Sequence, residues 1–446
     1  MLKFRKMYRK ILIVGYGVSG KFLREFCEQE NIFYEIYDDK IEKFNNKNSI
    51  NWLTIEGVFI SPGIPKYNQN RHHIFEEIEK YNLRVISDYD ILYAFNPRTI
   101  YIGITGTAGK TTTAYLVSYL LEKSGIRNTL CGNMGENIFV KSDVYVMEMG
   151  AHQLYSTENI GFDIVGITNI SPDHISEFED YSIYRAAKLS ILRKSFRKKQ
   201  YFLSSENIFP CNLGSIENVV NLSEKYSSLE HYVKEIRREI LRENNIDLSD
   251  RSDSFILNAN LACSMVEKMN ISKFQSRKFL KDFKIPEFRQ EQIGVFKGVK
   301  IINDSKSTNI TAGNSALKNK KCLWIAGGRL KNKDLTGLDI SSVDKCLFFG
   351  QDREIFEKFA KSQGKIFKSI EKLRNIQVTD IINNIKNVEN VENVENVENI
   401  KNIEYIIFSP IGQSLDEFSS YRERGNFFSN FIMKNLLRKS YLENPI

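Results

Sequence analysis

A glycine-rich loop that ends in a lysine and threonines is the segment of this sequence best suited to chemistry. The apolar run 101–105 leads into Gly-Thr-Ala-Gly-Lys-Thr-Thr at 106–112, and a helical pattern follows. Glycines let backbone N–H groups converge on phosphate oxygens, and the start of a helix adds positive potential. Lys110 can reach the outer phosphates of a nucleotide, and the Thr111 hydroxyl can bind Mg²⁺. The loop therefore predicts phosphate binding, although Ile104 stands where the strict pattern has its first glycine.

Three side chains further along the chain could handle a metal ion. Glu148 ends a second apolar run and His174 follows a third, so we expect both at the carboxyl edge of a parallel sheet, beside the loop. His174 is a candidate contact for a metal or a phosphate. Lys188 follows two alanines on a predicted helix and can approach the same edge. A charged amine would repel Mg²⁺, so Lys188 would have to lose its charge, for example as a carbamate.

The elements that must position these residues alternate between short apolar strands and helices. Ten strand segments are predicted: 10–17, 33–39, 56–63, 99–106, 143–150, 162–170, 300–306, 322–328, 346–350 and 404–410. Continuous apolar strands separated by helices predict an α/β fold with parallel sheets covered on both faces.

The strand series restarts near Pro97 and again near Pro286, which predicts three domains. We expect a Rossmann-like N-terminal domain over 1–97, a central P-loop ATPase-type parallel sheet over 98–286, and a C-terminal Rossmann-like domain over 287–446. The segment 15–20, Gly-Tyr-Gly-Val-Ser-Gly, is by itself a weak sign of dinucleotide binding.

Composition excludes several classes of function. The 446 residues are 42% apolar and 26% charged, as in a globular protein, and no apolar run approaches the ~18–20 residues of a membrane span. The net charge of +8 comes from interspersed lysines, so we expect no nucleic-acid partner. Six scattered cysteines without CxxC spacing indicate reduced thiols and a cytoplasmic location. A monomer is expected, and the Val-Glu-Asn repeat that starts at Val388 is interpreted as a surface loop or helix extension without a catalytic role.

Taken together, the motifs resemble the Mur ligase family over nearly the whole chain. The loop resembles TGTNGKST, and Tyr-Arg-Ala-Ala-Lys at 184–188 resembles the segment around the family's carbamylated lysine. Gly-Asn-Met-Gly at 132–135 resembles a GNIG turn that contacts a sugar-nucleotide. The segment 303–309 is very similar to the NDSKATN motif, and 409–425 resembles SPAxxSxDxFxxFxxRG, which is specific to members that add D-glutamate.

The resemblance implies an ATP-dependent amide ligase. ATP would phosphorylate the carboxylate of UDP-N-acetylmuramoyl-L-alanine, and the amine of D-glutamate would attack the acyl phosphate. Two Mg²⁺ ions are implied, one held by Thr111 and Glu148 and the other by His174 and carbamylated Lys188. The implied catalytic residues are Lys110, Glu148, His174 and Lys188.

Binding residues follow from the same resemblance. The implied ATP contacts are Gly106, Thr107, Gly109, Lys110, Thr111, Thr112, Asn260 for adenine, Arg289 for the γ-phosphate and Asp304 for the ribose. The implied contacts to the nucleotide substrate are Val18, Ser19, Asp38, Asp39, Ser61, Gly63, Asn133 and Gln153. The implied contacts at the amino-acid end are Lys306, Thr308, Lys331, Ser414 and Tyr421.

Several positions depart from the family pattern, and they keep alternatives open. The departures are Ala108, Gly150, Ala151, Ile256, Leu257 and Phe288. One alternative is a sister Mur or folylpolyglutamate-type ligase, although the DNPR-type motif expected of a diamino-acid-adding Mur ligase is absent from the sequence. The other is a degenerate ATP-binding module with weak or no ligase activity. The intact Lys110, Glu148, His174 and Lys188 argue against that module, because a pure binder needs no second metal site.

Overall fold

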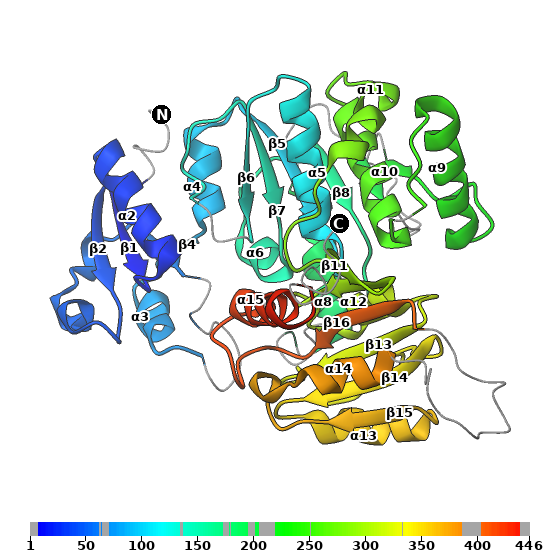
Figure 1. The fold of residues 1–446 in the computed structure, drawn as a ribbon. Helices are drawn as coiled ribbons and strands as arrows, with labels where there is room; N and C mark the ends of the chain where they lie inside the picture. Colours follow the sequence, from blue (N-terminus) through cyan, green and yellow to red (C-terminus); the bar gives the residue numbers. More distant parts are fainter. Residues whose placement is uncertain are drawn as a thin grey trace, which may run out of the picture. The chain divides into compact units, whose positions relative to one another are not determined.

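The computed structural model describes residues 8–61, 64, 71–133, 137–172, 178, 180–194, 201–204, 219–249, 251–331, 333–385 and 403–437. The chain divides into two compact units between Phe283 and Lys284. The first unit holds two sheets and the second holds one (Figure 1). All but one of the strand pairings in the described residues are parallel, which confirms the α/β class. The division of the first unit at residue 97 stays a prediction.

The N-terminal sheet has the strand order β2-β1-β3-β4. Its elements are β1 (Lys10–Val14), α2 (Val18–Glu30), β2 (Phe33–Tyr37), β3 (Gly57–Ile60), α3 (Ile74–Lys80), β4 (Val85–Ile86) and α4 (Asp88–Phe95). The apolar residues 11–14 of β1 are fully buried, as expected of a central parallel strand. Gly15 then turns the chain at φ 86°, and Gly20 of α2 is close enough that a Cβ there would lie 2.2 Å from the Gly15 carbonyl oxygen.

Helix α4 belongs to two hydrophobic cores. Its Tyr89 and Leu92 pack in the central core with Tyr101 and Tyr145, whereas Ile91 packs in the N-terminal core. The helix begins with a capping box, in which the side chain of Ser87 accepts from the backbone N–H of Asp90. Within the first unit, α4 therefore connects the two sheets through packing as well as through the chain.

The central sheet has the order β10-β9-β8-β5-β7-β6, with β5 between β8 and β7. Its elements are β5 (Ile100–Thr105), α5 (Lys110–Lys123), β6 (Asn128–Gly132), β7 (Val144–Glu148), α6 (Ala151–Ser156), β8 (Ile164–Ile167), α8 (Tyr181–Leu189), β9 (Tyr201–Ser204), β10 (Val219–Asn221), α9 (Leu229–Asn244), α10 (Asp253–Glu267) and α11 (Lys273–Lys278). After β5, the chain forms β6 and β7 on one side of it and then β8, β9 and β10 on the other side. In open α/β sheets, ligands bind at the carboxyl ends of the strands where the strand order changes side in this way.

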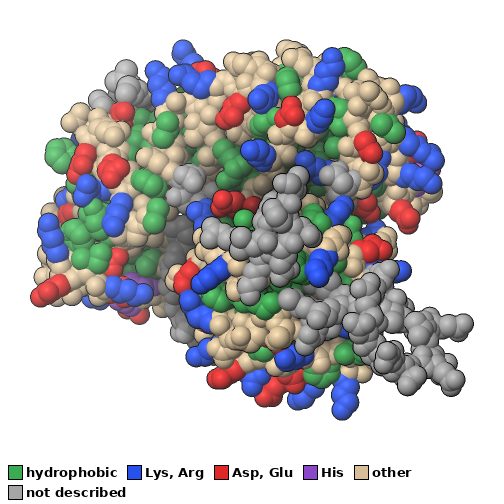
Figure 2. Space-filling model, viewed as in Figure 1, with side chains coloured by type: hydrophobic (Ala, Val, Ile, Leu, Met, Phe, Trp, Pro, Cys, Tyr) green, Lys and Arg blue, Asp and Glu red, His purple; other side chains and the backbone are tan. Residues whose placement is uncertain are grey.

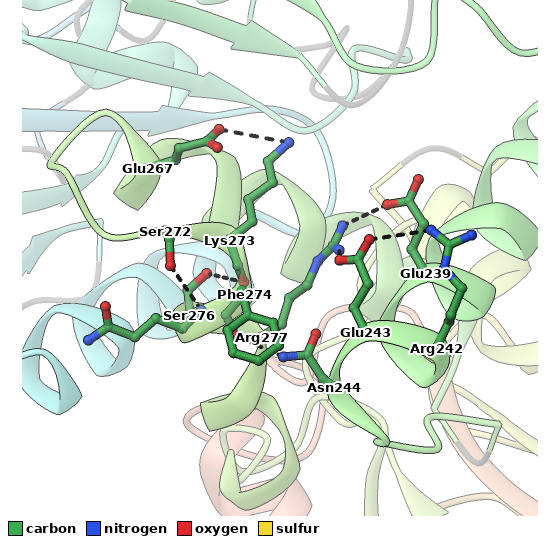
Figure 3. Close-up of polar contacts among 11 residues, drawn as sticks. Glu239, Arg242, Glu243, Asn244, Glu267, Ser272, Lys273, Phe274, Ser276 and Arg277 are labelled. Carbon is green, nitrogen blue, oxygen red and sulfur yellow. Dashed lines mark hydrogen bonds and ion pairs between the residues drawn. The ribbon is translucent and has the colours of Figure 1, made fainter.

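Polar contacts connect α9, α10 and α11, the last three α-helices of the first unit (Figure 3). Arg277 of α11 is 4% exposed, and its guanidinium bonds to Glu243 at 2.8 Å and to Glu239 at 2.9 Å, both on α9. The Asn244 amide also donates to the Phe274 carbonyl oxygen at 2.8 Å. These contacts fasten α11 to α9.

The second unit has one sheet of order β11-β12-β16-β13-β14-β15, in which only β11 runs antiparallel to its neighbour. Its elements are β11 (Glu291–Phe296), β12 (Val299–Asn303), α12 (Ile310–Leu317), β13 (Cys322–Gly327), β14 (Val343–Phe349), α13 (Arg353–Ser362), β15 (Ile366–Ser369), α14 (Val378–Ile385), β16 (Tyr405–Ile411), α15 (Tyr421–Ile432) and a π-helical turn (Met433–Leu437). Clusters of buried apolar side chains cover both faces of the sheet.

All ten predicted strands are present. Six further strands in the described residues were not predicted, namely β4, β6, β9, β10, β11 and β15. Five of them are edge strands, which have one unpaired side, and β9 lies next to the edge strand β10.

The surface has no single charged stripe on the face that Figure 2 shows, where Lys and Arg side chains are interspersed with Asp and Glu. Among the helices of the described residues, none is long and apolar enough to cross a membrane.

Candidate functional site

The glycine-rich loop connects β5 to α5, as predicted. Gly106 and Gly109 have φ angles of 146° and 82°, which favour glycine. A Cβ on Gly106 would lie 1.9 Å from the Thr168 hydroxyl, and one on Gly109 would lie 2.5 Å from Oδ1 of Asn258. The loop is therefore closely enclosed by neighbouring segments. Lys110 begins α5, and its Nζ donates to the Thr107 carbonyl oxygen at 2.9 Å.

Asn169, directly after β8, holds the backbone of Ala108 at both ends. The Ala108 N–H donates to Oδ1 of Asn169 at 2.9 Å, and Nδ2 of Asn169 donates to the Ala108 carbonyl oxygen at 3.1 Å. Sequence analysis missed Asn169 and Asn258. Asn169 could have been found, because it lies at the carboxyl end of the predicted strand 162–170, at the same sheet edge as the loop. Asn258 could not, because its place depends on how α10 packs along α5.

Lys188 lies beneath the loop. It is 2% exposed, its Nζ donates to the Gly106 carbonyl oxygen at 2.7 Å, and it lies 4.8 Å from the centroid of the Tyr184 ring. The Tyr184 hydroxyl is 3.1 Å from Oγ1 of Thr107. Helix α8 thus contacts the loop at two successive residues. The carbamate on Lys188 stays a prediction.

Glu148 lies at the end of β7 and is 3% exposed. Its Oε2 accepts a hydrogen bond from the Thr111 hydroxyl, and its Oε1 accepts from Nδ2 of Asn133 at 3.5 Å. A carboxylate and a hydroxyl in contact, next to a phosphate loop, are the hard oxygen ligands that suit Mg²⁺, which usually takes one or two carboxylates plus substrate phosphates and waters.

The rest of the predicted metal site is only partly described. His174 lies outside the described residues, as does Gly63, which was predicted as a contact to the nucleotide substrate. Within the described part of the chain, no three His, Cys, Asp or Glu side chains form a cluster that could hold a metal by themselves. A metal held by Thr111 and Glu148 would take its further ligands from the nucleotide, from water or from other residues.

Asn260 and Asn258, two residues apart on α10, have different environments. The amide of Asn260 donates to the Tyr232 hydroxyl of α9 at 2.6 Å, and both groups are buried. Asn258 instead faces Gly109 of the loop. The adenine contact proposed for Asn260 stays a prediction, and Asn258 is the α10 amide that lies next to the loop.

In the N-terminal sheet, the predicted nucleotide-substrate residues gather at the carboxyl ends of β1, β2 and β3. The Tyr16 N–H donates to Oδ2 of Asp38 at 2.7 Å, and the Ser61 hydroxyl donates to the Gly15 carbonyl oxygen at 2.6 Å. Asp39 lies 3.4 Å from Nε2 of His72. Val18 and Ser19 open α2, and Val18 is 59% exposed.

In the second unit, hydrogen bonds connect the motif at 303–309 to the motif at 409–425. Arg424 is fully buried and donates to the carbonyl oxygens of Ser305 at 2.8 Å and Gly412 at 2.9 Å. Burial lowers the pKa of the Arg424 guanidinium to about 10. The Asn303 amide donates to the Gly425 carbonyl oxygen at 2.9 Å. Segments about 120 residues apart are therefore held as one structure.

Asp304, between these contacts, is buried with two donors. The Ser409 hydroxyl and the Gln290 N–H each lie 3.1 Å from its carboxylate oxygens. Burial nevertheless raises the pKa of Asp304 to about 7, and these hydrogen bonds and the charge of Arg289 oppose the shift.

Two of the residues predicted to bind the amino-acid substrate, Lys306 and Tyr421, lie together. Nζ of Lys306 lies 3.9 Å from the centroid of the Tyr421 ring, which also meets the Phe288 ring edge-on. Phe288 has a φ of 61°, and its ring occupies the space beside Gly425.

Thr308, Lys331 and Ser414 occupy three different loops of the second unit. Thr308 precedes the cap of α12, Lys331 follows β13, and Ser414 follows β16 and is 5% exposed. Their shared contact with an amino acid stays a prediction.

Comparison with known proteins finds similarity to Mur ligases both in the centre of the chain and over nearly its whole length. The Mur ligase middle domain matches residues 104–261. UDP-N-acetylmuramoylalanine–D-glutamate ligases from Francisella tularensis subsp. novicida and Fusobacterium nucleatum subsp. nucleatum are 27% and 28% identical, over 95% and 96% of this chain and 95% and 99% of theirs. A UDP-N-acetylmuramate–alanine ligase from Thermotoga maritima matches with a TM-score of 0.55 and 14% identity, over 95% of this chain and 99% of that one, which shows a shared fold.

Proposed function

We infer that this chain is a member of the Mur ligase family, namely the ATP-dependent ligase that adds D-glutamate to UDP-N-acetylmuramoyl-L-alanine in peptidoglycan precursor synthesis. The full-length likeness to D-glutamate ligases supports the choice of substrates. The segment 409–425 adds to this support, because it resembles a motif specific to D-glutamate-adding members. The protein would act on these substrates in the cytoplasm.

One observation carries the proposal: four functional side chains from three separate elements meet at a single glycine-rich loop. Lys110 and Thr111 begin α5, Glu148 ends β7, and Lys188 reaches the Gly106 carbonyl oxygen from α8. A module that only bound nucleotide would need the loop and its lysine. It would not need a buried carboxylate on Thr111 and a buried lysine beneath the loop.

The loop would bind the phosphates of ATP, with Lys110 swinging from the Thr107 carbonyl oxygen to the transferring phosphoryl group. Phosphoryl transfer depends on positioning and on charge neutralisation, which Lys110 and the start of α5 supply. Thr111 and Glu148 would hold one Mg²⁺, and His174 with Lys188 a second, and these ions would add positive charge at the same place.

Lys188 could serve a metal only after losing its positive charge. A carbamate would replace the ammonium with two oxygens, which are suitable ligands for Mg²⁺. Lys188 is 2% exposed and contacts the Gly106 carbonyl oxygen, so a carbamate formed there would lie beside the loop.

The second substrate is a dicarboxylate, and the proposed set for it is rich in donors. Lys306, Lys331, Thr308, Ser414 and Tyr421 offer ammonium and hydroxyl groups, which bind carboxylates through charge-assisted hydrogen bonds. Arg289 would contact the γ-phosphate and Asp304 the ribose.

The proposal is tested by phosphate release from ATP with UDP-N-acetylmuramoyl-L-alanine, with and without D-glutamate, and by mass analysis of the product. Release that requires D-glutamate, and a product heavier by one glutamyl residue, are expected. Phosphate release that does not depend on D-glutamate, or that depends on another amino acid instead, would indicate a sister ligase. No release despite nucleotide binding would indicate a binding module.

A further inference from the structure

A row of side-chain amides connects the buried Tyr89 of α4 to Glu148. Nε2 of Gln153 lies 3.3 Å from the Tyr89 hydroxyl and 3.2 Å from Oδ1 of Asn133. Nδ2 of Asn133 lies 3.5 Å from Oε1 of Glu148. The row starts at the backbone N–H of Gly150, which is 2.6 Å from Oε1 of Gln153.

The direction of every hydrogen bond in this row follows from its first member. A backbone N–H can only donate, so the oxygen of Gln153 must face Gly150. The NH₂ group of Gln153 is then left for Asn133, which must present its own oxygen. The NH₂ group of Asn133 therefore faces Glu148, which as a carboxylate can only accept. Both carboxylate oxygens of Glu148 are thereby held, one by Asn133 and the other by Thr111.

Gly150 leaves room for the first contact in the arrangement seen here. Its φ and ψ of −76° and 166° are open to any residue, so the backbone itself does not require glycine. A Cβ at this position, however, would lie 2.5 Å from Oε1 of Gln153. The family pattern has serine here, and this chain's glycine lets the Gln153 amide approach the start of α6.

We propose that Gly150 and Gln153 are positioning residues that fix the Asn133 amide against Glu148 and so hold this carboxylate in its metal-binding orientation. This inference rests on the proposed function, in which Glu148 is a ligand of Mg²⁺. It assigns Gln153 a role within the protein, toward Glu148, in addition to the substrate contact implied by the family. The Tyr89 hydroxyl accepts the second N–H of the Gln153 amide, so it holds this amide from the side of the core.

The experiment measures the affinity of the full chain for ADP by titration calorimetry, with Mg²⁺ and with EDTA, together with the melting temperature. Gln153→Met keeps the length of the side chain and removes the amide. Gly150→Ala adds only the Cβ. We expect each to weaken binding of Mg·ADP about three- to tenfold, the effect of one or two ordinary hydrogen bonds, and to leave metal-free ADP unchanged. The double variant should lose no more than either single variant, because both act through one contact.

Tyr145→Phe is the matched control. It removes a buried hydroxyl from the same core cluster as Tyr89, but that hydroxyl donates to the Val140 carbonyl oxygen, away from Glu148. It should leave the Mg·ADP and ADP affinities as in the parent. If Gln153→Met and Gly150→Ala also behave like the parent, or weaken metal-free ADP equally, the positioning role is overturned.

Glu148→Gln separates this inference from the function on which it rests. The parent should bind ADP more tightly with Mg²⁺ than without, and Glu148→Gln should lose that difference. If the parent shows no difference, the proposed metal site fails. If the difference is present and depends on Glu148, but not on Gln153 or Gly150, only the positioning role fails.

Discussion

The ammonium of Lys188 donates to the carbonyl oxygen of Gly106 at 2.7 Å, across 82 residues of sequence. The contact places a buried lysine directly beneath the loop proposed to bind phosphates. It also sets a condition on the proposed carbamate, since a carbamylated Lys188 would present oxygens and one N–H where the ammonium now donates.

We predict that Lys188→Ala loses phosphate release by about a hundredfold or more, because it removes a proposed metal ligand. Short carboxylic acids added to the assay should partly restore activity by occupying the vacated space. Lys188→Met, which refills that space, should not be restored. If Lys188→Ala remains fully active, the carbamate assignment is wrong.

Thr111→Val should lower phosphate release about a hundredfold, because it removes the hydroxyl that contacts Glu148 and would bind Mg²⁺. Thr113→Val is a matched control in the same helix. The buried Thr113 hydroxyl has no hydrogen-bond partner among the described residues, so its replacement by a methyl group should leave activity unchanged and the melting temperature equal or higher. Equal loss in both variants would assign the effect to packing of α5.

Asp304 should make folding stability depend on pH. Burial raises its pKa from 3.8 to about 7, so the folded state binds this proton more tightly than the unfolded state. The resulting stabilisation is fully present below pH 3.8 and is lost as the pH rises through 7. Its size is ~4 kcal/mol at most.

Urea unfolding of the parent and of Asp304→Asn between pH 4 and pH 8 tests this dependence. The unfolding free energy of the parent, relative to the variant, should fall between about pH 4 and pH 7 and then level off. Ser409→Ala removes a donor to the carboxylate, so it should move the fall to higher pH. A difference that grows with pH would contradict the prediction.

Arg277→Met should destabilise the first unit by about 1–3 kcal/mol, because it removes two charge-assisted hydrogen bonds between α11 and α9. Arg242→Met is the control, since Arg242 pairs with the same Glu243 but is 75% exposed, and it should change stability little. Thermal unfolding of both variants measures the difference. Equal effects would mean that burial of Arg277 contributes nothing.

The sequence allowed prediction of those parts of the fold and site that lie in short contiguous segments. The loop at 106–112 and the ten apolar strands are of this kind, because glycine spacing and apolar runs are local properties. Asn169, Asn258 and Tyr89 were not predicted. Their contacts to residues 61, 149 and 64 positions away, respectively, exist only once the sheet and helices have packed.

The position of β16 has a consequence for the order in which the second unit can form. This strand, close to the end of the chain, lies between β12 and β13 and pairs with both. During synthesis, β12 and β13 emerge first and cannot close their sheet until Tyr405–Ile411 has left the ribosome. The pairing of such distant segments makes folding slow. Unfinished chains therefore carry a split sheet, and the amino-acid site proposed for this unit cannot form before β16 has joined it.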